Sequence, residues 1–355
     1  MVKGLILAAG EGSRLRPFTF SRPKHLIPLL GKPIIQYAID DLVSINVRDI
    51  GVVVGYFGDK IKEFLGEDSR FGAKFTYIVQ KKRLGIAHAI YRAIKQGFID
   101  KEFIVYLGDN ILSGGISRHV KSWGEAGSEV HILLTKVRDP GRFGIAVLRD
   151  GKILKLVEKP QEHISDLAVV GVYMFRDPEL VAKAFSTLKP SWRGEYEITD
   201  LIQWFVDKGY KVTFSLVTGW WKDVGTYEGL LDAIYLLLDN VKPRVEGKIE
   251  GEVRGRVVVE EGAIVEGTVH GPAYIGKDVY IGRSGLVEHY VSMEQGSRII
   301  SGTVARSMIL DESELYLNKA RLVDSVVGPK SIIKSNREIY GDIKLVISDY
   351  SKVFL

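Results

Sequence analysis

Hydrophobic and polar positions along the first 240 residues follow two alternating patterns. Short continuous apolar runs are typical of buried strands, and segments whose apolar residues recur every three or four positions are typical of helices. The runs predict strands at Lys3–Ala8, Asp49–Gly55, Lys74–Gln80 and Phe103–Leu107. The helical spacing predicts helices at Ile34–Ile45, Asp59–Leu65, Ile86–Gln96, Glu195–Lys208 and Thr226–Leu238. With further strand patterns between Ser128 and Phe175, this alternation predicts a Rossmann-like α/β fold with a doubly wound, mostly parallel mixed sheet.

Beyond Val241 the pattern changes, because helical spacing ends and apolar residues recur at every sixth position. The recurring positions are Val257, Ala263, Val269, Ile275, Ile281, Val287, Met293, Ile299 and Ala305. A period of six is typical of hexapeptide-repeat parallel β-helices, in which each sixth residue stacks into the core. Chance in a segment rich in valine and glycine is the alternative. We therefore expect two domains, residues 1–240 and residues 241–355, the second a left-handed parallel β-helix whose repeat weakens after Asp311.

Composition narrows the class of protein. The chain of 355 residues is 46% hydrophobic and 26% charged, which excludes a disordered or collagen-like chain. The net charge of +5 is small, so we expect no nucleic-acid partner. The chain has no cysteine, which excludes disulfides, thiolate nucleophiles and cysteine metal sites. No apolar run is long enough to span a membrane, so we expect a cytoplasmic protein without a membrane partner.

A glycine-rich, basic turn follows the first predicted strand. Gly10 and Gly12 allow the backbone to approach a ligand and to present N–H groups to phosphate. Ser13 adds a hydroxyl, and Arg14 and Lys24 add positive charge. The turn lacks the third glycine of a dinucleotide-binding fingerprint and the Gly-Lys-Ser/Thr of a Walker loop. It therefore predicts a phosphate-binding loop of a third kind, with an ordinary connection as the alternative.

Charged residues also stand at predicted strand ends. Asp109 follows Phe103–Leu107, and Asp223 follows a predicted strand at Lys211–Val217. Ligands of doubly wound sheets bind at the carboxyl ends of strands, where two carboxylates can hold a Mg²⁺ ion that bridges nucleotide phosphates. Glu158 and Lys159 end another strand; the carboxylate can accept sugar hydroxyls and the lysine can neutralise a phosphate. Solvated turns and strand ends are the alternative interpretation of these residues.

Together these motifs resemble the sugar-1-phosphate nucleotidylyltransferases, and the similarity covers essentially the whole chain. The N-terminal match runs LAAGEGSRLRPFTFSRPKHLIPLLGKP from Leu7 to Pro33. Further matches are Gly-Asp-Asn at 108–110, Glu-Lys-Pro at 158–160, Gly-Glu-Tyr-Glu-Ile-Thr-Asp at 194–200 and Trp-Lys-Asp-Val-Gly-Thr at 221–226. With the C-terminal repeat, the chain looks like the long form of glucose-1-phosphate thymidylyltransferase. In that family a sugar 1-phosphate oxygen attacks the α-phosphorus of a nucleoside triphosphate, and pyrophosphate leaves.

The resemblance implies a role for each matching residue. Gly10, Gly12 and Ser13 would contact the nucleotide, Arg14 the leaving pyrophosphate and Lys24 the α-phosphate, while Gln80 and Gly85 would read the base. Asp109 and Asp223 would hold Mg²⁺, the expected cofactor. Gly144, Glu158 and Gly171 would contact the sugar, and Lys159 its phosphate. The expected substrates are dTTP, with UTP second, and glucose 1-phosphate.

The sequence departs from the family at two places. The base-site run is QKKRLGIAHA from Gln80 to Ala89, in which both family prolines are absent and His88 replaces a glutamine. Phe143 stands where the family often has tyrosine. Both departures bear on specificity rather than on the reaction.

Two other functions fit the same layout. One is a non-catalytic regulatory subunit, but such a chain should lack one of Lys24, Asp109, Lys159 or Asp223, and all four are present. The other is a bifunctional enzyme whose β-helix is an acyltransferase, but the coil is short and shows no clear general-base histidine. We expect the coil to serve stability or subunit assembly, and the protein to be a homo-oligomer.

Overall fold

The computed structural model describes residues 2–66 and 70–355, and the chain folds as two compact units. The sheet unit comprises Met1–Glu11 and Ile34–Asp223. The coil unit comprises Gly12–Pro33 and Val224–Leu355. These units differ from the expected division at residue 240, because the segment Gly12–Pro33 and the last α-helix pack with the C-terminal strands. None of the helices in the described residues is long and apolar enough to cross a membrane.

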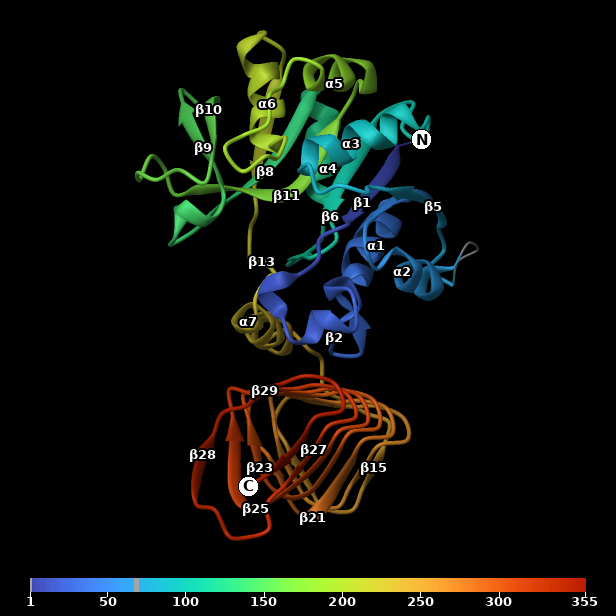
Figure 1. Ribbon diagram of the computed structural model, residues 1–355, viewed down its shortest axis with the longest axis vertical. Helices are drawn as coiled ribbons and strands as arrows, with labels where there is room; N and C mark the ends of the chain where they lie inside the picture. Colours follow the sequence, from blue (N-terminus) through green and yellow to red (C-terminus); the bar gives the residue numbers. More distant parts are fainter. Residues whose placement is uncertain (1, 67–69) are drawn as a thin grey trace. The chain divides into compact units, whose positions relative to one another are not determined.

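The sheet unit is built on a mixed β-sheet (Figure 1). Its first half consists of parallel strands in the order β5-β4-β1-β6. These are β1 (Lys3–Ala8), β4 (Asp49–Val54), β5 (Lys74–Val79) and β6 (Phe103–Leu107). The other half joins β6 through antiparallel pairing and consists of β8 (Val130–Lys136), β9 (Gly144–Arg149), β10 (Lys152–Glu158), β11 (Leu167–Phe175) and β12 (Val212–Leu216). The parallel strands match their predicted bounds to within one residue, and the strand-rich region after Ser128 is confirmed.

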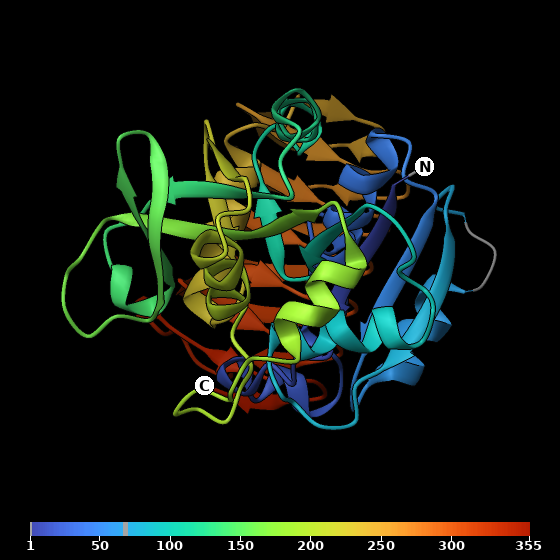
Figure 2. The same ribbon diagram turned by 90° about the horizontal axis from the view of Figure 1, so that it is seen from above.

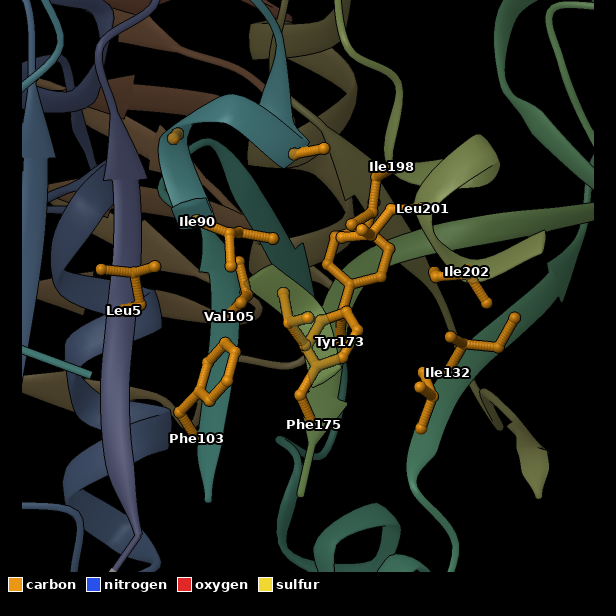
Figure 3. Close-up of a cluster of buried hydrophobic side chains, with 14 of the residues drawn as sticks. Leu5, Ile90, Phe103, Val105, Ile132, Tyr173, Phe175, Ile198, Leu201 and Ile202 are labelled. Atoms are coloured by element: carbon orange, nitrogen blue, oxygen red, sulfur yellow. The ribbon is translucent and has the colours of Figure 1, made fainter. Parts of the chain in front are cut away.

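Helices cover both faces of this sheet. They are α1 (Ile34–Ser44), α2 (Gly58–Leu65), α3 (Ile86–Lys95), α4 (Ser117–Ala126), α5 (Pro178–Phe185) and α6 (Ile198–Asp207). Side chains alternate between the two faces of a strand, so Phe103 and Val105 of β6 pack in a core under α3, α5 and α6 (Figure 3). Tyr106 points to the opposite face, where its hydroxyl donates to Asp41 of α1 over 2.8 Å. The β9–β10 hairpin extends away from α3 and α5 (Figures 1 and 2).

The coil unit begins with the segment that carries the glycine-rich motif. It forms short 3₁₀ turns rather than an α-helix, as its prolines predict: η1 (Ser13–Leu15), η2 (Phe18–Phe20) and η3 (Lys24–Leu26). A two-stranded hairpin follows, β2 (Pro28–Leu29) and β3 (Lys32–Pro33). Helix α7 (Tyr227–Leu238) starts at Thr226, whose hydroxyl caps it by accepting from the Gly229 N–H over 3.1 Å.

The rest of the coil unit is a stack of parallel strands, as the repeat predicts. One sheet contains β14 (Arg244–Val245), β17 (Val257–Val259), β20 (Ala273–Ile275), β22 (Val291–Met293), β24 (Met308–Ile309), β26 (Val326–Val327) and β29 (Val346–Ile347). The other contains β15 (Lys248–Ile249), β16 (Glu252–Arg254), β18 (Ile264–Val265), β19 (Thr268–His270), β21 (Tyr280–Val287), β23 (Arg298–Ala305), β25 (Glu314–Val323), β27 (Ile332–Lys334), β28 (Gly341–Ile343) and β30 (Lys352–Phe354). We call this stack the coil.

In the middle of the coil, stacked residues follow the period of six. Ile275 pairs with Met293, and Ile281 pairs with Ile299, so one coil turn advances by three steps of the repeat. All the positions of the predicted repeat are buried. The spacing is not uniform along the coil: Val257 pairs with Ala273 and Ser292 pairs with Met308, each 16 residues apart, whereas Ala320 pairs with Gly341, 21 residues apart.

Candidate active site

The first part of the site lies where the order of the parallel strands reverses, on either side of β1. β4 pairs with β1 on one side and β6 pairs with it on the other, and ligands of such sheets bind outside the carboxyl ends of the strands at this point. Gly10 follows the end of β1, and Asp109 follows the end of β6. The Gly108 N–H donates to the Leu7 carbonyl over 3.0 Å, so the two chain ends leave the sheet side by side.

A short ladder brings the two predicted metal ligands together. β7 (Asn110–Leu112) pairs antiparallel with β13 (Trp221–Asp223), and Asp223 lies opposite Asn110. Residues paired across an antiparallel ladder have Cα atoms about 4.5–5.5 Å apart, so Asp223 is next to the neighbour of Asn110, Asp109. The sequence predicted a strand at Lys211–Val217 before Asp223, and β12 (Val212–Leu216) matches that strand. The short strand β13, which Asp223 ends, was not predicted.

The buried Asn110 side chain stabilises this ladder through hydrogen bonds. Its Nδ2 donates to Asp109 Oδ1 over 2.9 Å, and its Oδ1 accepts from Trp221 Nε1 over 2.7 Å and from the Gly171 N–H over 3.2 Å. A Cβ at Gly171 would lie 2.5 Å from Asn110 Oδ1, so only glycine permits this approach. One predicted sugar-contact position is thus held beside one predicted metal ligand.

The buried Tyr173 side chain is affected by the charges of three carboxylates of the site. It lies on β11, two residues after Gly171, and is buried in the core shown in Figure 3. Burial raises the pKa of its hydroxyl strongly, and the charges of Glu158, Asp109 and Asp223 raise it further. These three acidic residues come from separate segments of the chain, and the fold brings them near enough for their charges to act on one side chain.

Glu158 ends β10 beside a glycine that leaves it room. A Cβ at Gly144, its partner across the β9–β10 hairpin, would lie 3.1 Å from Glu158 Oε2 and 2.6 Å from Thr199 Cγ2. The Thr199 hydroxyl donates to Glu158 Oε2 over 3.5 Å. Burial and the nearby Glu197 raise the pKa of Glu158, while Lys159 and Arg193 act in the opposite direction. Its half-buried carboxylate is available to accept hydroxyl groups from a ligand.

Arg193 connects the acidic residues on this side of the site. Its guanidinium contacts Glu158 over 3.4 Å, Glu195 over 3.2 Å and Glu197 over 3.4 Å. The sequence interpretation gave no role to Arg193, Thr199 or Tyr173. The sequence could have indicated Arg193 and Thr199, because they lie in or next to the matched segment 194–200.

Lys159 directly follows Glu158 in a strained backbone conformation. Its φ of 42° is in the left-handed region, and its N–H donates to the Phe143 carbonyl over 3.0 Å. The Phe143 ring in turn meets Trp221 edge-on, with 5.2 Å between the ring centroids. The half-buried Lys159 is thereby tied to β13, the strand that ends at Asp223.

The predicted base-reading residues form a second cluster in the sheet unit. Gln80 follows β5 and is 7% exposed; its Nε2 donates to the Gly85 carbonyl over 3.2 Å and lies 3.0 Å from His88 Nδ1. A Cβ at Gly85 would lie 2.4 Å from the Tyr196 carbonyl oxygen, so the backbone there requires glycine. Burial and the charge of Arg92 lower the pKa of His88, so its ring is neutral at pH 7 and Nδ1 can accept from Gln80.

The remaining predicted residues belong to the coil unit. Gly12 has φ 67°, and its carbonyl accepts from the Thr19 hydroxyl over 2.8 Å, which folds the segment over itself. A Cβ at Gly12 would lie 2.9 Å from Thr19 Cγ2 and 3.2 Å from Lys24 Cβ. Lys24 is 9% exposed, whereas Ser13 and Arg14 are exposed on η1. This segment supplies backbone N–H groups and two cations.

Asp109 and Asp223 fit a hard divalent cation. Carboxylate oxygens are the ligands that Mg²⁺ prefers, and Asn110 orients one of them. Across residues 2–66 and 70–355 no group of three or more histidine, cysteine or acidic side chains could hold a metal ion. A cation held by the two aspartates would therefore take its other ligands from substrate oxygens and water, as Mg²⁺ commonly does.

Comparison with known proteins identifies the family of the chain. The sequence profile of the family described as nucleotidyl transferase matches residues 3–240. A glucose-1-phosphate thymidylyltransferase of Streptomyces griseus is 37% identical over 356 residues, covering 99% of each chain. The low-salt glycan biosynthesis nucleotidyltransferase Agl11 of Haloferax volcanii is 37% identical over 361 residues, covering 100% of each chain.

A solved structure shows the same fold. The crystal structure titled as a putative glucose-1-phosphate thymidylyltransferase from Bacillus anthracis superposes with a TM-score of 0.61 at 38% sequence identity. It covers 66% of this chain and 94% of that chain. With the full-length relatives, this match confirms the family that the sequence motifs indicate. The chain therefore belongs to the nucleotidyl transferase family, and it is an enzyme of that family.

Proposed function

We propose that the protein is a glucose-1-phosphate thymidylyltransferase, which converts dTTP and glucose 1-phosphate into dTDP-glucose and pyrophosphate. The observation that carries the proposal is the β7–β13 ladder, because it sets Asp223 beside Asp109 and, through Asn110, beside Gly171. The two proposed cation ligands thus lie near Gly171, a proposed sugar contact. The names of the relatives supply the substrate class.

The reaction needs positioning and charge neutralisation rather than a protein nucleophile. A phosphate oxygen of the sugar 1-phosphate forms the new bond to the α-phosphorus, and the bond from that phosphorus to the β-phosphate oxygen breaks. We assign Arg14 to the leaving pyrophosphate, Lys24 to the α-phosphate and Lys159 to the sugar phosphate. The backbone of Gly10, Gly12 and Ser13 would contact the nucleotide.

Enzymes of this family generally use a divalent metal. We propose Mg²⁺, held by Asp109 and Asp223. Two carboxylates suit this hard cation, because they leave the rest of its coordination shell to water and phosphate oxygens. When bound, such an ion orients the phosphate and offsets its charge.

Base selection is assigned to Gln80 and Gly85. An amide side chain offers one donor and one acceptor, which match the imide edge of thymine or uracil. Since these bases differ by one methyl group, worth about 1–3 kcal/mol in an apolar pocket, we expect dTTP to be preferred and UTP to be used measurably.

Gly144, Glu158 and Gly171 are assigned to the sugar. Glu158 is the acceptor for hydroxyl groups, since its carboxylate is partly exposed and oriented by Thr199. Gly144 and Gly171 let Thr199 and Asn110 pack against the backbone here, and we assign their backbone groups to the sugar. Phe143, which lacks the hydroxyl of the frequent tyrosine, offers this edge of the site only an apolar ring.

We further propose that the coil is left-handed, as hexapeptide repeats typically are, that the protein is a homo-oligomer and that it works in the cytoplasm, where nucleoside triphosphates are made.

The proposed reaction is tested by incubating the full chain with dTTP, glucose 1-phosphate and Mg²⁺ and separating the products by anion-exchange chromatography. Formation of dTDP-glucose in an amount equal to the pyrophosphate released supports it. Hydrolysis of dTTP without a nucleotide sugar contradicts it.

A further inference from the structure

The segment Gly12–Pro33, which we call the signature loop, contacts the coil on both sides of Lys24. Both are parts of the same compact unit. One contact involves Ser21 and Arg22, just before Lys24, and the other involves the turn of the β2–β3 hairpin after it. The coil therefore meets the loop at two points that bracket a residue assigned to phosphate.

The first contact is centred on Asp349, in the turn between β29 and β30. Its Oδ2 accepts from Arg22 Nη2 over 2.8 Å and from the Ser21 hydroxyl over 2.7 Å. The neighbouring Ser348 hydroxyl donates to the Pro17 carbonyl over 3.2 Å. Residues more than 320 positions apart in sequence are thus joined by three hydrogen bonds.

This contact is well shielded from solvent. The side chains of Asp349 and Arg22 are 10% and 22% exposed. Arg22 Nε and Asp349 Oδ1 are buried and find no hydrogen-bond partner among residues 2–66 and 70–355. The charge of Arg22 also lowers the pKa of Asp311, another coil carboxyl, although burial raises that pKa overall. Removing one partner of such a pair leaves a buried charge uncompensated, which is costly.

The second contact is made by Glu294, which follows β22 and is 1% exposed. Its Oε2 accepts from the Gly31 N–H over 2.9 Å, and its Oε1 accepts from the Ser292 hydroxyl over 2.7 Å. The Leu30 N–H also bonds to this carboxyl. A buried carboxylate of the coil therefore receives the backbone of the hairpin turn.

The hairpin turn needs such support. Leu30 and Gly31 have φ of 52° and 76°, so both central residues are left-handed, as in a type I′ turn. Leucine is unfavourable in that conformation, and asparagine or glycine is the usual choice. A Cβ at Gly31 would lie 2.2 Å from the Tyr274 hydroxyl oxygen, so the turn is fitted closely against the coil. The coil holds the turn in a shape that its sequence alone disfavours.

From this geometry we propose that Asp349 and Glu294 are positioning residues for nucleotidyl transfer, which hold the signature loop so that Lys24 and Arg14 meet the nucleotide. This inference rests on the proposed function and adds to it, because the sequence led us to expect only a role in stability or subunit assembly for the coil. A loop that is in its competent shape for only a fraction of the time binds its ligand more weakly by that same fraction. The coil carboxylates keep that fraction close to one.

The test compares Asp349→Asn and Glu294→Gln with a matched control. Each variant preserves side-chain size. Asp349→Asn removes the negative charge that Arg22 contacts, and Glu294→Gln replaces one of the two carboxyl oxygens that accept from Gly31 and Ser292 with an amide NH₂. We expect kcat/KM for dTTP to fall at least about tenfold in each variant. The reason is that the apparent affinity for dTTP falls in proportion to the fraction of molecules whose loop has the competent shape. KM for glucose 1-phosphate should stay within about twofold, because its proposed contacts lie outside the loop.

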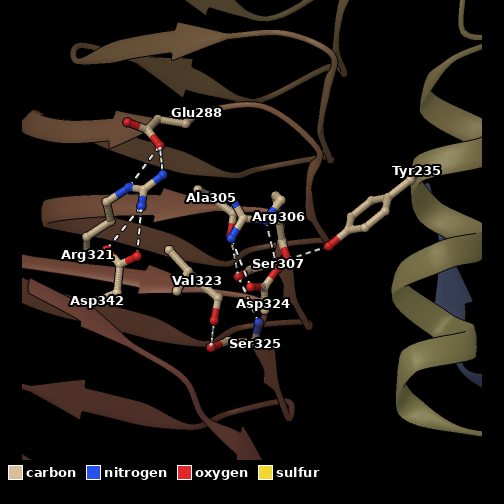
Figure 4. Close-up of polar contacts among 10 residues, drawn as sticks. All are labelled: Tyr235, Glu288, Ala305, Arg306, Ser307, Arg321, Val323, Asp324, Ser325 and Asp342. Carbon is tan, nitrogen blue, oxygen red and sulfur yellow. Dashed lines mark hydrogen bonds and ion pairs between the residues drawn. The ribbon is translucent and has the colours of Figure 1, made fainter.

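Asp324→Asn is the control. Asp324 accepts from Arg306 Nε and Nη2, both over 2.8 Å (Figure 4), and the charges of Lys344 and Arg321 of the coil also lower its pKa. This variant breaks a coil ion pair of similar length without touching the signature loop. It should leave kcat/KM unchanged. Equal losses in all three variants, in step with their melting temperatures, would overturn the proposal and leave a purely structural role.

A charge reversal tests the pairing itself. Arg22→Asp should lose activity as Asp349→Asn does, and the double variant Arg22→Asp with Asp349→Arg should recover part of it. Recovery supports a specific positioning contact. A double variant no better than the worse single variant, while still folded by circular dichroism, contradicts it.

Hydrogen exchange of the protein without substrate gives a readout independent of activity. Peptides covering residues 12–33 should exchange faster in Asp349→Asn and Glu294→Gln than in the wild type and Asp324→Asn. If the wild type transfers no nucleotide to any sugar phosphate, the proposed function fails, but this exchange difference still shows whether the coil holds the loop. Unchanged exchange in both variants would refute the holding contact itself.

Discussion

Asp223 lies directly opposite Asn110 in the β7–β13 ladder, and this pairing is what places it beside Asp109. The two aspartates are separated by more than a hundred residues, and β13 is only three residues long. The Asn110 side chain adds hydrogen bonds to Asp109, to Trp221 of β13 and to Gly171. The geometry of the proposed metal site therefore depends on a small, locally buried polar arrangement.

Asp223→Asn should slow transfer by at least about 10²–10³, the usual cost of losing one electrostatic contact to the developing charge. Asparagine keeps the size of the side chain but lacks the negative charge that a hard cation requires. Initial rates of pyrophosphate release across a Mg²⁺ titration measure the effect, with circular dichroism to check the fold. High Mg²⁺ should restore a little activity. Near-normal turnover at low Mg²⁺ would show that Asp223 is only a structural residue of the ladder.

Lys24→Ala should be slowed by a similar factor, about 10²–10³, for a different reason. Its charge is assigned to phosphate directly, so the Mg²⁺ concentration that gives half-maximal rate should not change. The same titration, run beside Asp223→Asn, separates the two roles. A shifted Mg²⁺ requirement in Lys24→Ala would mean that the lysine acts through the metal site.

The contact between His88 and Gln80 predicts a pH dependence of nucleotide binding. His88 Nδ1 accepts from Gln80 only while the ring is neutral, and its pKa is lowered, so protonation occurs below the ordinary value of 6.5. As pH falls through that range, KM for dTTP should rise about three- to tenfold, since a buried donor without its partner costs about 1 kcal/mol. His88→Gln, which cannot titrate, should show a flat profile. Parallel profiles in the two proteins would remove His88 from the base site.

Two buried histidines predict acid sensitivity of the fold. His131 on β8 contacts Thr213 and Ser215, His119 on α4 shares Ser215, and burial lowers the pKa of both histidines to about 4. Between pH 6.5 and about 4 the unfolded chain binds more protons than the folded chain. The free energy of unfolding should therefore fall as pH falls through this window. Each histidine contributes about 1.4 kcal/mol for each unit by which folding lowers its pKa.

The matched comparison is His131→Gln against His163→Gln, an exposed histidine. Denaturant unfolding at pH 7, 5.5 and 4.5 should show a smaller acid loss in His131→Gln than in the wild type, and no difference in His163→Gln. Identical slopes for all three proteins would mean that other groups govern the acid response.

Local patterns predicted much of the fold. The strands around Gly10 and Asp109 follow from buried apolar runs, and Ile275, Ile281 and Met293 stack as their period of six requires. These features depend on residues near one another in sequence, so hydrophobic periodicity is sufficient to find them. The motif match then assigned roles to residues that the fold places at strand ends.

Other features depend on pairing between distant segments. The register that sets Asp223 against Asn110, the clustering of Glu158 with Arg193, and the contact of Arg22 with Asp349 have no local signature. A two- or three-residue strand carries too little pattern to predict, and an ion pair between remote residues follows only from the completed fold. For the same reason the sequence could not assign the signature loop to the unit that contains the coil.

We propose above all that this chain joins a nucleotide to a sugar 1-phosphate, with dTTP and glucose 1-phosphate preferred. The most direct measurement is the initial rate of pyrophosphate release over a grid of nucleoside triphosphates and sugar 1-phosphates, with Mg²⁺ present throughout. We predict the highest rate for dTTP with glucose 1-phosphate, a measurable rate for UTP, and poor rates for ATP and GTP. A strong preference for ATP or GTP would contradict the assigned base site, and no pyrophosphate release with any pair would contradict the function itself.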